Sequence, residues 1–410
     1  MDEIKIALLS CGAEYSGIYR ELESAARKFN AKLIHPYVET KNIDLATEEL
    51  GLDVASPDLR LMAARAESIA KDETDADAVF VCTCFRCAEG TLMRSAVRRY
   101  IHERSDIPII SYSFTERTTA ATLYTRMEAL TTTARRKDIL ARKRQEGITA
   151  GIDSGSTTTK ATIMQENEVI GRGWVPTTDV KESAEKAFND ALNDAGLNKG
   201  DIEALGTTGY GRFLIGEKMH ADLVQEEITV NAKGGVFLAE KQEGPATIID
   251  IGGMDNKAIS VQNGIPGSFT MGGICAGASG RFLEIASRRL GVGIEELGPL
   301  ALKGDYRNVE MNSYCIVFGI QSLVNALSKG TIPADVASAA CHSVAEQVFE
   351  QQLQEIEIKE PVIMVGGCSL IGGLVKTMED LLRVKVTVPR DSQYIGAVGA
   401  SLLSSGFIGD

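Results

Sequence analysis

The sequence predicts an α/β protein in two parts: an N-terminal α/β domain on a parallel sheet, and a C-terminal module that contains one supersecondary unit twice. The first observation is that apolar strands alternate with helical patterns through the first 113 residues. The second is an internal duplication, because GIDSGSTTTKATI (151–163) and IIDIGGMDNKAIS (248–260) share one design. In each, an apolar strand ends in Asp, a Gly-containing turn follows, and a return strand completes a hairpin.

The N-terminal pattern is regular. Strands are expected at 4–10, 32–38, 77–84 and 107–113, and helices at 15–29, 57–71 and 88–103. Strands separated by helices of this length imply a parallel sheet with helices on both faces. We therefore assign residues 1–113 to a thiol-rich α/β domain and 114–146 to a helical linker, whose basic segment (134–145) is expected to be solvated.

The C-terminal module follows. A β-meander is expected over 148–153, 159–165 and 168–174. A helix over 179–195 and a strand at 202–209 follow it. The second copy of the unit begins with the hairpin segment 245–272. We assign 147–244 to a first lobe and 245–410 to a second. Two facing copies of such a hairpin predict a nucleotide held in the cleft between related lobes.

Composition narrows the class of protein. The 410 residues carry a net charge of −13, with 44% hydrophobic and 24% charged residues. This charge argues against nucleic acid as a partner, and no apolar run has the length of a membrane span. The N-terminal residues lack the basic region of a signal peptide, so we expect a cytoplasmic protein whose eight cysteines are reduced thiols or metal ligands.

The two hairpins carry the residues expected to bind ATP or ADP with Mg²⁺. Asp153 and Asp250 end their strands, where they would hold Mg²⁺ through water and organise the attacking water. No Walker sequence is present, and a Ser/Thr-rich turn without function is the alternative for the first hairpin alone. The expected phosphate contacts of the first hairpin are Gly155, Ser156, Thr157, Thr158 and Lys160. The expected glycine turns are Gly252 and Gly253 in the second hairpin, and Gly366 and Gly367, which would lie against adenine or ribose.

These motifs resemble the ASKHA superfamily of ribonuclease H-like, actin-like ATPases. More closely, residues 148–403 resemble the BadF/BadG/BcrA/BcrD family, which includes the activator of 2-hydroxyglutaryl-CoA dehydratase. The motifs that carry the resemblance are GIDSGSTTTK, TTGYGR, EITVNAKG, IDIGGMDNK, CAGASGRFLE, YCIVF, LSKG and VGG. The whole chain also looks like the methanogenesis marker protein 15 family.

The resemblance implies a [4Fe–4S] cluster at a homodimer interface, ligated in each subunit by Cys275 and Cys315. Both thiols stand just before helical patterns, and a helix N-terminus stabilises thiolates and anionic clusters. The alternative is that both are small buried hydrophobic residues.

The N-terminal domain offers a second thiol site. Cys82, Cys84 and Cys87 follow one strand and Cys11 follows another, and ligands gather at the carboxyl ends of parallel strands. The four thiols are expected to form a second cluster or zinc site, with a C-x-x-C redox pair and unligated thiols as alternatives.

The leading hypothesis is an ATP-dependent activator that transfers low-potential electrons. The resemblance implies a donor such as ferredoxin, and as partner an electron-accepting metalloenzyme or maturation complex connected to methyl-coenzyme M reductase. The alternatives are a small-molecule kinase and a nucleotide-binding scaffold or sensor without catalysis. The scaffold draws support from the segment CIVFGIQSLV around Cys315, which lacks an acidic pair that the family has there. Met254 in place of Gln and Asn231 in place of a frequent His are further departures from the family pattern.

Overall fold

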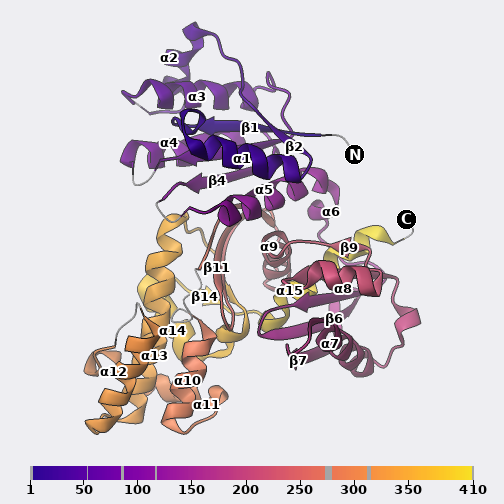
Figure 1. Cartoon of the computed structure of the whole chain (residues 1–410), viewed down its shortest axis with the longest axis vertical. Helices are drawn as coiled ribbons and strands as arrows, with labels where there is room; N and C mark the ends of the chain where they lie inside the picture. The colour runs from indigo at the N-terminus through magenta and orange to yellow at the C-terminus, as the bar shows by residue number, and fades with distance from the viewer. Residues whose placement is uncertain are drawn as a thin grey trace. The chain divides into compact units, whose positions relative to one another are not determined.

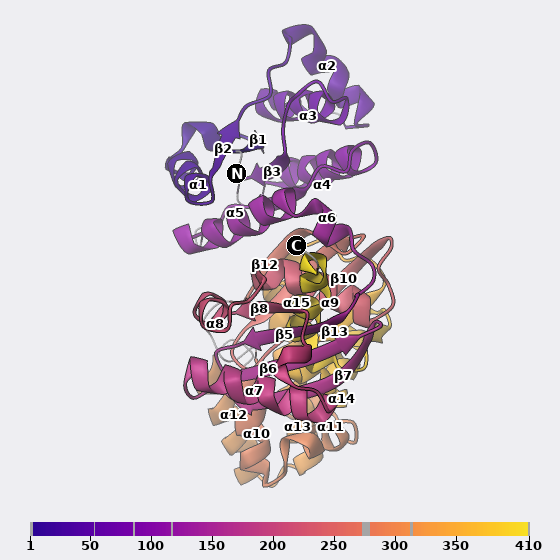
Figure 2. The same ribbon diagram turned by 90° about the vertical axis from the view of Figure 1, so that its right-hand side faces the viewer.

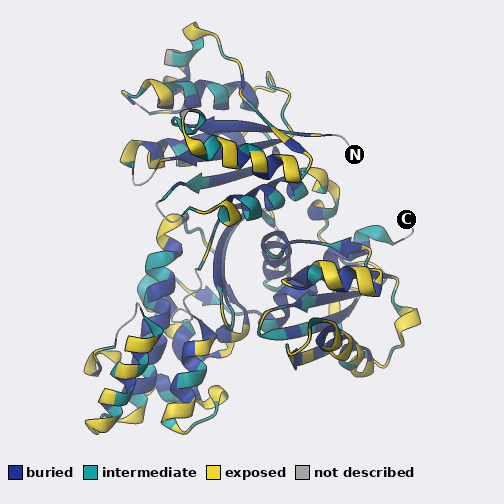
Figure 3. Cartoon of the chain, in the orientation of Figure 1, coloured by how far each residue is buried: buried dark blue, intermediate teal, exposed yellow. Residues whose placement is uncertain are grey.

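The computed structural model describes residues 3–52, 54–84, 87–115, 118–272, 279–311 and 315–408. The chain divides into two compact units, Met1–Asp138 and Ile139–Asp410. No helix within the described ranges is long and apolar enough to cross a lipid bilayer. Figure 3 shows strands buried inside each unit, with exposed residues on the outward sides of the helices.

The N-terminal unit contains a four-stranded parallel sheet in the order β2-β1-β3-β4. This confirms the parallel sheet expected from the sequence, although the second strand is shorter than expected. The bounds are β1 Ile4–Ser10, β2 Ala31–Ile34, β3 Ala78–Thr83 and β4 Ile109–Ser113.

Helices cover both faces of this sheet. Helices α1 and α5 pack together over one face, and α3 and α4 over the other, as Figures 1 and 2 show. The sequence pattern did not identify α2, which packs against α3. The bounds are α1 Gly17–Lys28, α2 Thr40–Glu49, α3 Pro57–Ala70, α4 Ala88–His102 and α5 Ala120–Arg135.

The single helix expected over 114–145 is instead two helices, α5 and the short α6 (Lys137–Ala141). Arg136 interrupts them with φ −115° and ψ 30°, outside the helical region. Helix α5 is also no solvated connector, because Leu123, Met127 and Leu130 are buried within the N-terminal unit. The polar Thr residues of this helix concealed its buried face.

The C-terminal unit contains two five-stranded sheets with the same connectivity. One has the order β7-β6-β5-β8-β9 and the other β12-β11-β10-β13-β14. In each, the first three strands are antiparallel and the last two run parallel to the first, so the structure contains the duplication that the sequence indicated. The first sheet has β5 Ile148–Ser154, β6 Thr158–Gln165, β7 Glu168–Pro176, β8 Ala204–Gly209 and β9 Leu223–Val224. The second has β10 Pro245–Ile251, β11 Asn256–Gln262, β12 Ile265–Met271, β13 Val362–Val365 and β14 Val386–Thr387.

Local signals account for several helices of this unit. Helix α7, for example, begins after Asp179, whose carboxylate accepts the Lys181 and Glu182 N–H groups, and ends at Gly196 in the left-handed region. The helices are α7 Val180–Ala195, α8 Arg212–Met219, α9 Glu227–Leu238, α10 Gly280–Leu290, α11 Ile294–Ala301, α12 Ile316–Ser328, α13 Pro333–Gln351, α14 Gly372–Leu382 and α15 Ile395–Ser404.

Helices α9 and α15 pack closely against each other (Figure 1). A Cβ atom at Gly399 would lie 2.2 Å from the Val230 carbonyl oxygen, so this crossing tolerates no side chain. Helix α15 also packs on β5 and β8, although it falls within the residues assigned to the second lobe. The chain therefore returns to the first sheet at its end.

We predict that Gly399→Ala destabilises the protein by about 1–3 kcal/mol, because the added methyl group forces α9 and α15 apart. Thermal unfolding monitored by circular dichroism measures the effect. Gly200→Ala is the matched control, since a Cβ atom there meets nothing within 4 Å. Equal melting temperatures for the two variants would contradict the prediction.

Candidate functional site

Each hairpin places a carboxylate beside an ammonium group. Asp153 is the cross-strand partner of Lys160, and Asp250 of Lys257. The Lys160 Nζ–Asp153 Oδ2 distance is 3.6 Å, and the Lys257 Nζ–Asp250 Oδ2 distance is 3.9 Å. The duplication therefore repeats an Asp–Lys pair as well as a backbone shape.

The two hairpin turns touch. A Cβ atom at Gly253 would lie 3.0 Å from the Thr157 hydroxyl oxygen. Thr177, just after β7, braces the first turn: its N–H donates to the Thr157 carbonyl oxygen (2.9 Å) and its hydroxyl to the Gly155 carbonyl oxygen (2.8 Å). The structure thus brings together residues that are about a hundred positions apart in the sequence.

Burial shifts the ionisation of both aspartates. Burial raises the pKa of Asp250 to about 6, although the Lys257 ammonium opposes the shift. Burial also raises the pKa of Asp153, opposed chiefly by Lys160. Lys160 also acts on Asp250 and Lys257 on Asp153, so the two hairpins share one electrostatic site.

Lys257 is the centre of a charge network that sequence reasoning missed. Its Nζ lies 2.9 Å from Glu227 Oε2 and also pairs with Asp255. Burial alone would lower the pKa of Lys257, but Glu227, Asp250 and Asp255 raise it well above its usual value. Burial would likewise raise the pKa of Asp255, yet Lys257 holds it below its usual value. The signal was present in the sequence, because both copies place a Lys seven residues after the Asp.

Some buried polar atoms on the elements that carry or contact the aspartates have no hydrogen-bond partner among the described residues. Asn231, which stands where the family often has His, donates from Nδ2 to Asp250 Oδ2 at 2.8 Å. Among the residues that the structure describes, its Oδ1 has no hydrogen-bond partner, nor do the hydroxyls of Ser154 and Thr208. Buried polar groups are normally paired. Carboxylates and neutral oxygens fit a hydrated Mg²⁺, and hydroxyls fit phosphate.

The third glycine turn lies against Asp250. Gly366 has φ +82° and ψ 171°, a conformation open essentially to glycine alone. A Cβ atom there would lie 2.5 Å from Asp250 Oδ1, whereas one at Gly367 would meet nothing within 4 Å. The nearby Asp250 carboxylate and the backbone conformation therefore already explain why residue 366 is a glycine. The predicted contact of this turn with adenine or ribose stays a prediction.

Helix α10 starts on the second hairpin turn. The Gly280 N–H donates to the Gly252 carbonyl oxygen and the Arg281 N–H to the Gly253 carbonyl oxygen, both at 2.9 Å. The sequence just before this helix contains Cys275, which lies outside the described residues.

Cys315 is the N-cap of α12, which packs against α10, and its side chain is half-buried. The next two residues after Ile316 are apolar and exposed, Val317 at 65% and Phe318 at 61%. Cys341 and Cys368 are buried, and burial raises the pKa of each thiol to about 12.

The structure brings the N-terminal thiols to one edge of the sheet. Burial, together with the neighbouring Cys11 and Cys87 thiols, raises the pKa of Cys84 to about 11. Cys82 is fully buried in β3, and burial raises its pKa well above its usual value. Across the described part of the chain, no group of three or more His, Cys, Asp or Glu side chains is disposed to hold a metal ion.

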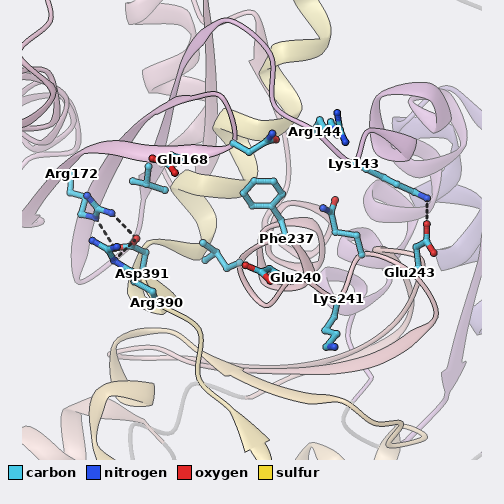
Figure 4. Close-up of a pocket in the computed structure, with 14 residues that line it drawn as sticks. Lys143, Arg144, Glu168, Arg172, Phe237, Glu240, Lys241, Glu243, Arg390 and Asp391 are labelled. Carbon is cyan, nitrogen blue, oxygen red and sulfur yellow. Dashed lines mark hydrogen bonds and ion pairs between the residues drawn. The ribbon is translucent and has the colours of Figure 1, made fainter.

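A pocket of about 730 Å³ lies at the end of the first sheet away from Asp153 (Figure 4). Its charged residues are largely paired. Arg172 donates to Asp391 through Nε (2.6 Å) and Nη2 (2.7 Å), and Lys143 pairs with Glu243. The lining includes none of the residues expected to bind nucleotide, so this pocket is separate from the hairpin site.

We predict that Lys257→Met destabilises the fold by about 3–5 kcal/mol at pH 7.5, because it leaves buried carboxylates without their cation. Urea unfolding measures the effect, with Lys160→Met as the control that removes the other hairpin lysine. The penalty should shrink as the pH falls from 7.5 towards 6, since loss of Lys257 raises the pKa of Asp250 further and its protonation then removes part of the repulsion. A pH-independent penalty would contradict this account.

Comparison with known proteins agrees with this geometry. "Uncharacterized protein MJ0800" of Methanocaldococcus jannaschii is 62% identical over 404 residues, spanning 98% of this chain and 97% of that protein. The (R)-2-hydroxyglutaryl-CoA dehydratase activating ATPase of Acidaminococcus fermentans is 32% identical over 255 residues, spanning 62% of this chain and 95% of the relative.

A solved structure is also similar. The activator of the 2-hydroxyisocaproyl-CoA dehydratase from Clostridium difficile, with bound ADPNP, matches with a TM-score of 0.58 and 28% identity, covering 64% of this chain and 95% of that one. Residues 150–404 match the BadF/BadG/BcrA/BcrD ATPase family. The twin Asp–Lys hairpins thus lie inside the matched region, and this chain belongs to the BadF/BadG/BcrA/BcrD ATPase family.

Proposed function

We propose that this protein is an ATP-dependent activator that delivers low-potential electrons to a partner enzyme. ATP or ADP binds with Mg²⁺ between the two hairpins, and two copies of the chain share one [4Fe–4S] cluster through Cys275 and Cys315. Relatives whose names describe an activating ATPase and a dehydratase activator support an ATP-driven activator role.

The nucleotide part of the proposal is supported by the chemistry of the hairpin site. Asp153 and Asp250 are the Mg²⁺-binding carboxylates. Thr208, whose hydroxyl has no partner among the described residues, is the cross-strand neighbour of Asp153, and Asn231 donates to Asp250. The first turn (Gly155–Thr158) and Lys160 hold phosphate from one side, and Gly252 and Gly253 from the other. A solved relative with bound ADPNP supports nucleotide binding by this module.

The cluster part is supported by the surroundings of Cys315. This thiol caps a helix of thirteen residues, whose free N–H groups and dipole favour a thiolate. Exposed Val317 and Phe318 next to it fit an apolar contact with a second copy. When bound, a [4Fe–4S] cluster supplies a one-electron carrier whose potential depends on hydrogen bonds and solvent exposure.

One observation carries the proposal: helix α10 is hydrogen-bonded through Gly280 and Arg281 to the carbonyls of the second phosphate turn. A change in that turn with the nucleotide's phosphates would move the start of α10 directly. Because α12 packs against α10, the movement would reach Cys315. Nucleotide state and cluster surroundings are then coupled through two helices.

The partner is an electron-accepting metalloenzyme or a maturation complex. One relative is named as an activator of lactoyl-CoA dehydratase and another as a component of benzoyl-CoA reductase, and both support this class of partner. We propose a ferredoxin-type protein as the electron donor. The methyl-coenzyme M reductase system is the narrower candidate for the acceptor, implied by the resemblance to the marker protein family.

The cysteines provide the test. After anaerobic reconstitution with iron and sulfide, Cys275→Ala and Cys315→Ala should each lose about four irons per dimer relative to the unmodified chain. Cys341→Ala is the matched control, because Cys341 is fully buried in α13. If the iron and sulfide content were unchanged in both the Cys275→Ala and the Cys315→Ala variants, the proposed bridging cluster would be rejected.

The dimer gives a second prediction. Phe318→Glu places a charge on the proposed apolar contact and should reduce the mass in solution from dimer to monomer. Light scattering after anaerobic gel filtration measures it. The control is Tyr37→Glu, which alters a side chain that is 85% exposed in the other unit. A Phe318→Glu variant that stays dimeric would remove this surface from the interface.

A further inference from the structure

We propose that Cys11, Cys84 and Cys87 form a second metal centre in the N-terminal unit, which binds a thiophilic metal as a zinc ion or an iron–sulfur cluster. The proposal does not depend on the function proposed above. It concerns a unit that lies outside the family match at residues 150–404.

The sheet topology brings these thiols together. Strands β1 and β3 are adjacent and parallel, with Ser10 paired to Cys82 near their carboxyl ends. Cys11 directly follows β1 and Cys84 directly follows β3. Cys87 comes three residues later as the N-cap of α4. All three therefore lie at the carboxyl edge of the sheet, where α/β proteins place their ligands.

The thiols lie close together. The Cys11 and Cys87 thiols are near enough to Cys84 to help raise the pKa of its thiol, after burial. The Cys84 N–H donates to Cys11 Sγ at 3.2 Å, and the Gly90 N–H donates to Cys87 Sγ at 3.3 Å. Backbone N–H donors to sulfur stabilise the thiolate form that binds metals.

Two further features of the surroundings suit sulfur ligands of a metal. Cys87 caps the fifteen-residue helix α4, whose N-terminus carries partial positive charge. Thr83 lies beside Cys87, since a Cβ atom at Gly90 would be 3.3 Å from Thr83 Cβ and 3.4 Å from Cys87 Sγ. The Thr83 hydroxyl is buried, and no described residue is its hydrogen-bond partner. This hydroxyl could donate a hydrogen bond to a nearby thiolate.

Cys82 is not part of the proposed ligand set. Its side chain is fully buried in the sheet, and burial raises the pKa of its thiol well above its usual value. Three thiolates leave one position of a tetrahedral ion, or one iron of a cubane cluster, for a ligand from outside the set.

In the present conformation, no group of three such side chains among the described residues is disposed around an ion. Binding requires each thiol to lose its proton and turn about its Cα–Cβ bond toward a common centre. Cys84 is exposed and the other two are half-buried, so these rotations displace no buried core.

A dithiol–disulfide pair is the competing use of the same residues. A pair would need two thiols, whereas here two thiols flank Cys84 and both of them accept a backbone N–H. This arrangement favours a centre that uses all three sulfurs over a pair that leaves one unused.

The test uses the full chain in a Cys275→Ala, Cys315→Ala background, so that iron bound by the proposed bridging cluster cannot contribute. Anaerobic protein is loaded in separate arms with zinc chloride or with ferrous iron and sulfide, and bound metal is quantified by mass spectrometry. We expect about one zinc per chain, or a cluster of about four irons with sulfide-to-iron absorption. Cys84→Ser should lose that metal, whereas Cys82→Ala should keep it.

The outcomes separate the proposals. Three results would overturn the three-cysteine centre. They are metal retained in Cys84→Ser, metal lost equally in Cys82→Ala, and no metal bound in either arm. Recovery of an intramolecular disulfide with no metal uptake would assign the residues to thiol redox chemistry instead. None of these results bears on the bridging cluster proposed for Cys275 and Cys315. Its iron content is measured separately, in chains whose N-terminal cysteines are unchanged.

Discussion

The contact between the two hairpin turns is the constraint on which the ATPase module depends. Thr157 lies so close to Gly253 that a side chain in the second turn would have to displace it. Asp153 and Asp250 are buried behind these turns, and burial raises the pKa of both. Lys160 and Lys257 then act as cations inside a site that must hold several negative groups. The fold therefore contains its own counter-charges before any ligand binds.

The same turn links the site to the rest of the second lobe. Its glycine carbonyls accept the first N–H groups of α10, so the residues proposed to hold phosphate also hold a helix. A hydrogen bond is short and directional, which makes this a stiff connection. Helix α12 and Cys315 are the next elements in contact. The N-terminal unit places its thiols by a different route, at the carboxyl ends of two parallel strands.

Part of the site could be predicted from the sequence because the duplication is local. Asp153 and Asp250 stand out as acids that end apolar strands, and the glycine turns follow directly. Glu227 could not be found in this way, because it begins a separate helix and reaches Lys257 only in the folded chain. Asn231 was noticed as a departure from the family, but its hydrogen bond to Asp250 depends on how α9 packs against β10.

The sequence by itself determined the parallel N-terminal sheet, the duplicated hairpins and the family, since strand periodicity and turn residues are encoded over short stretches. Tertiary structure decided where α15 packs, why α5 is buried and which thiols meet. Those features depend on contacts between residues far apart in the chain, such as Val230 with Gly399 and Cys11 with Cys84. Local propensity carries no information about such pairs, because their energy arises only when packing brings them together.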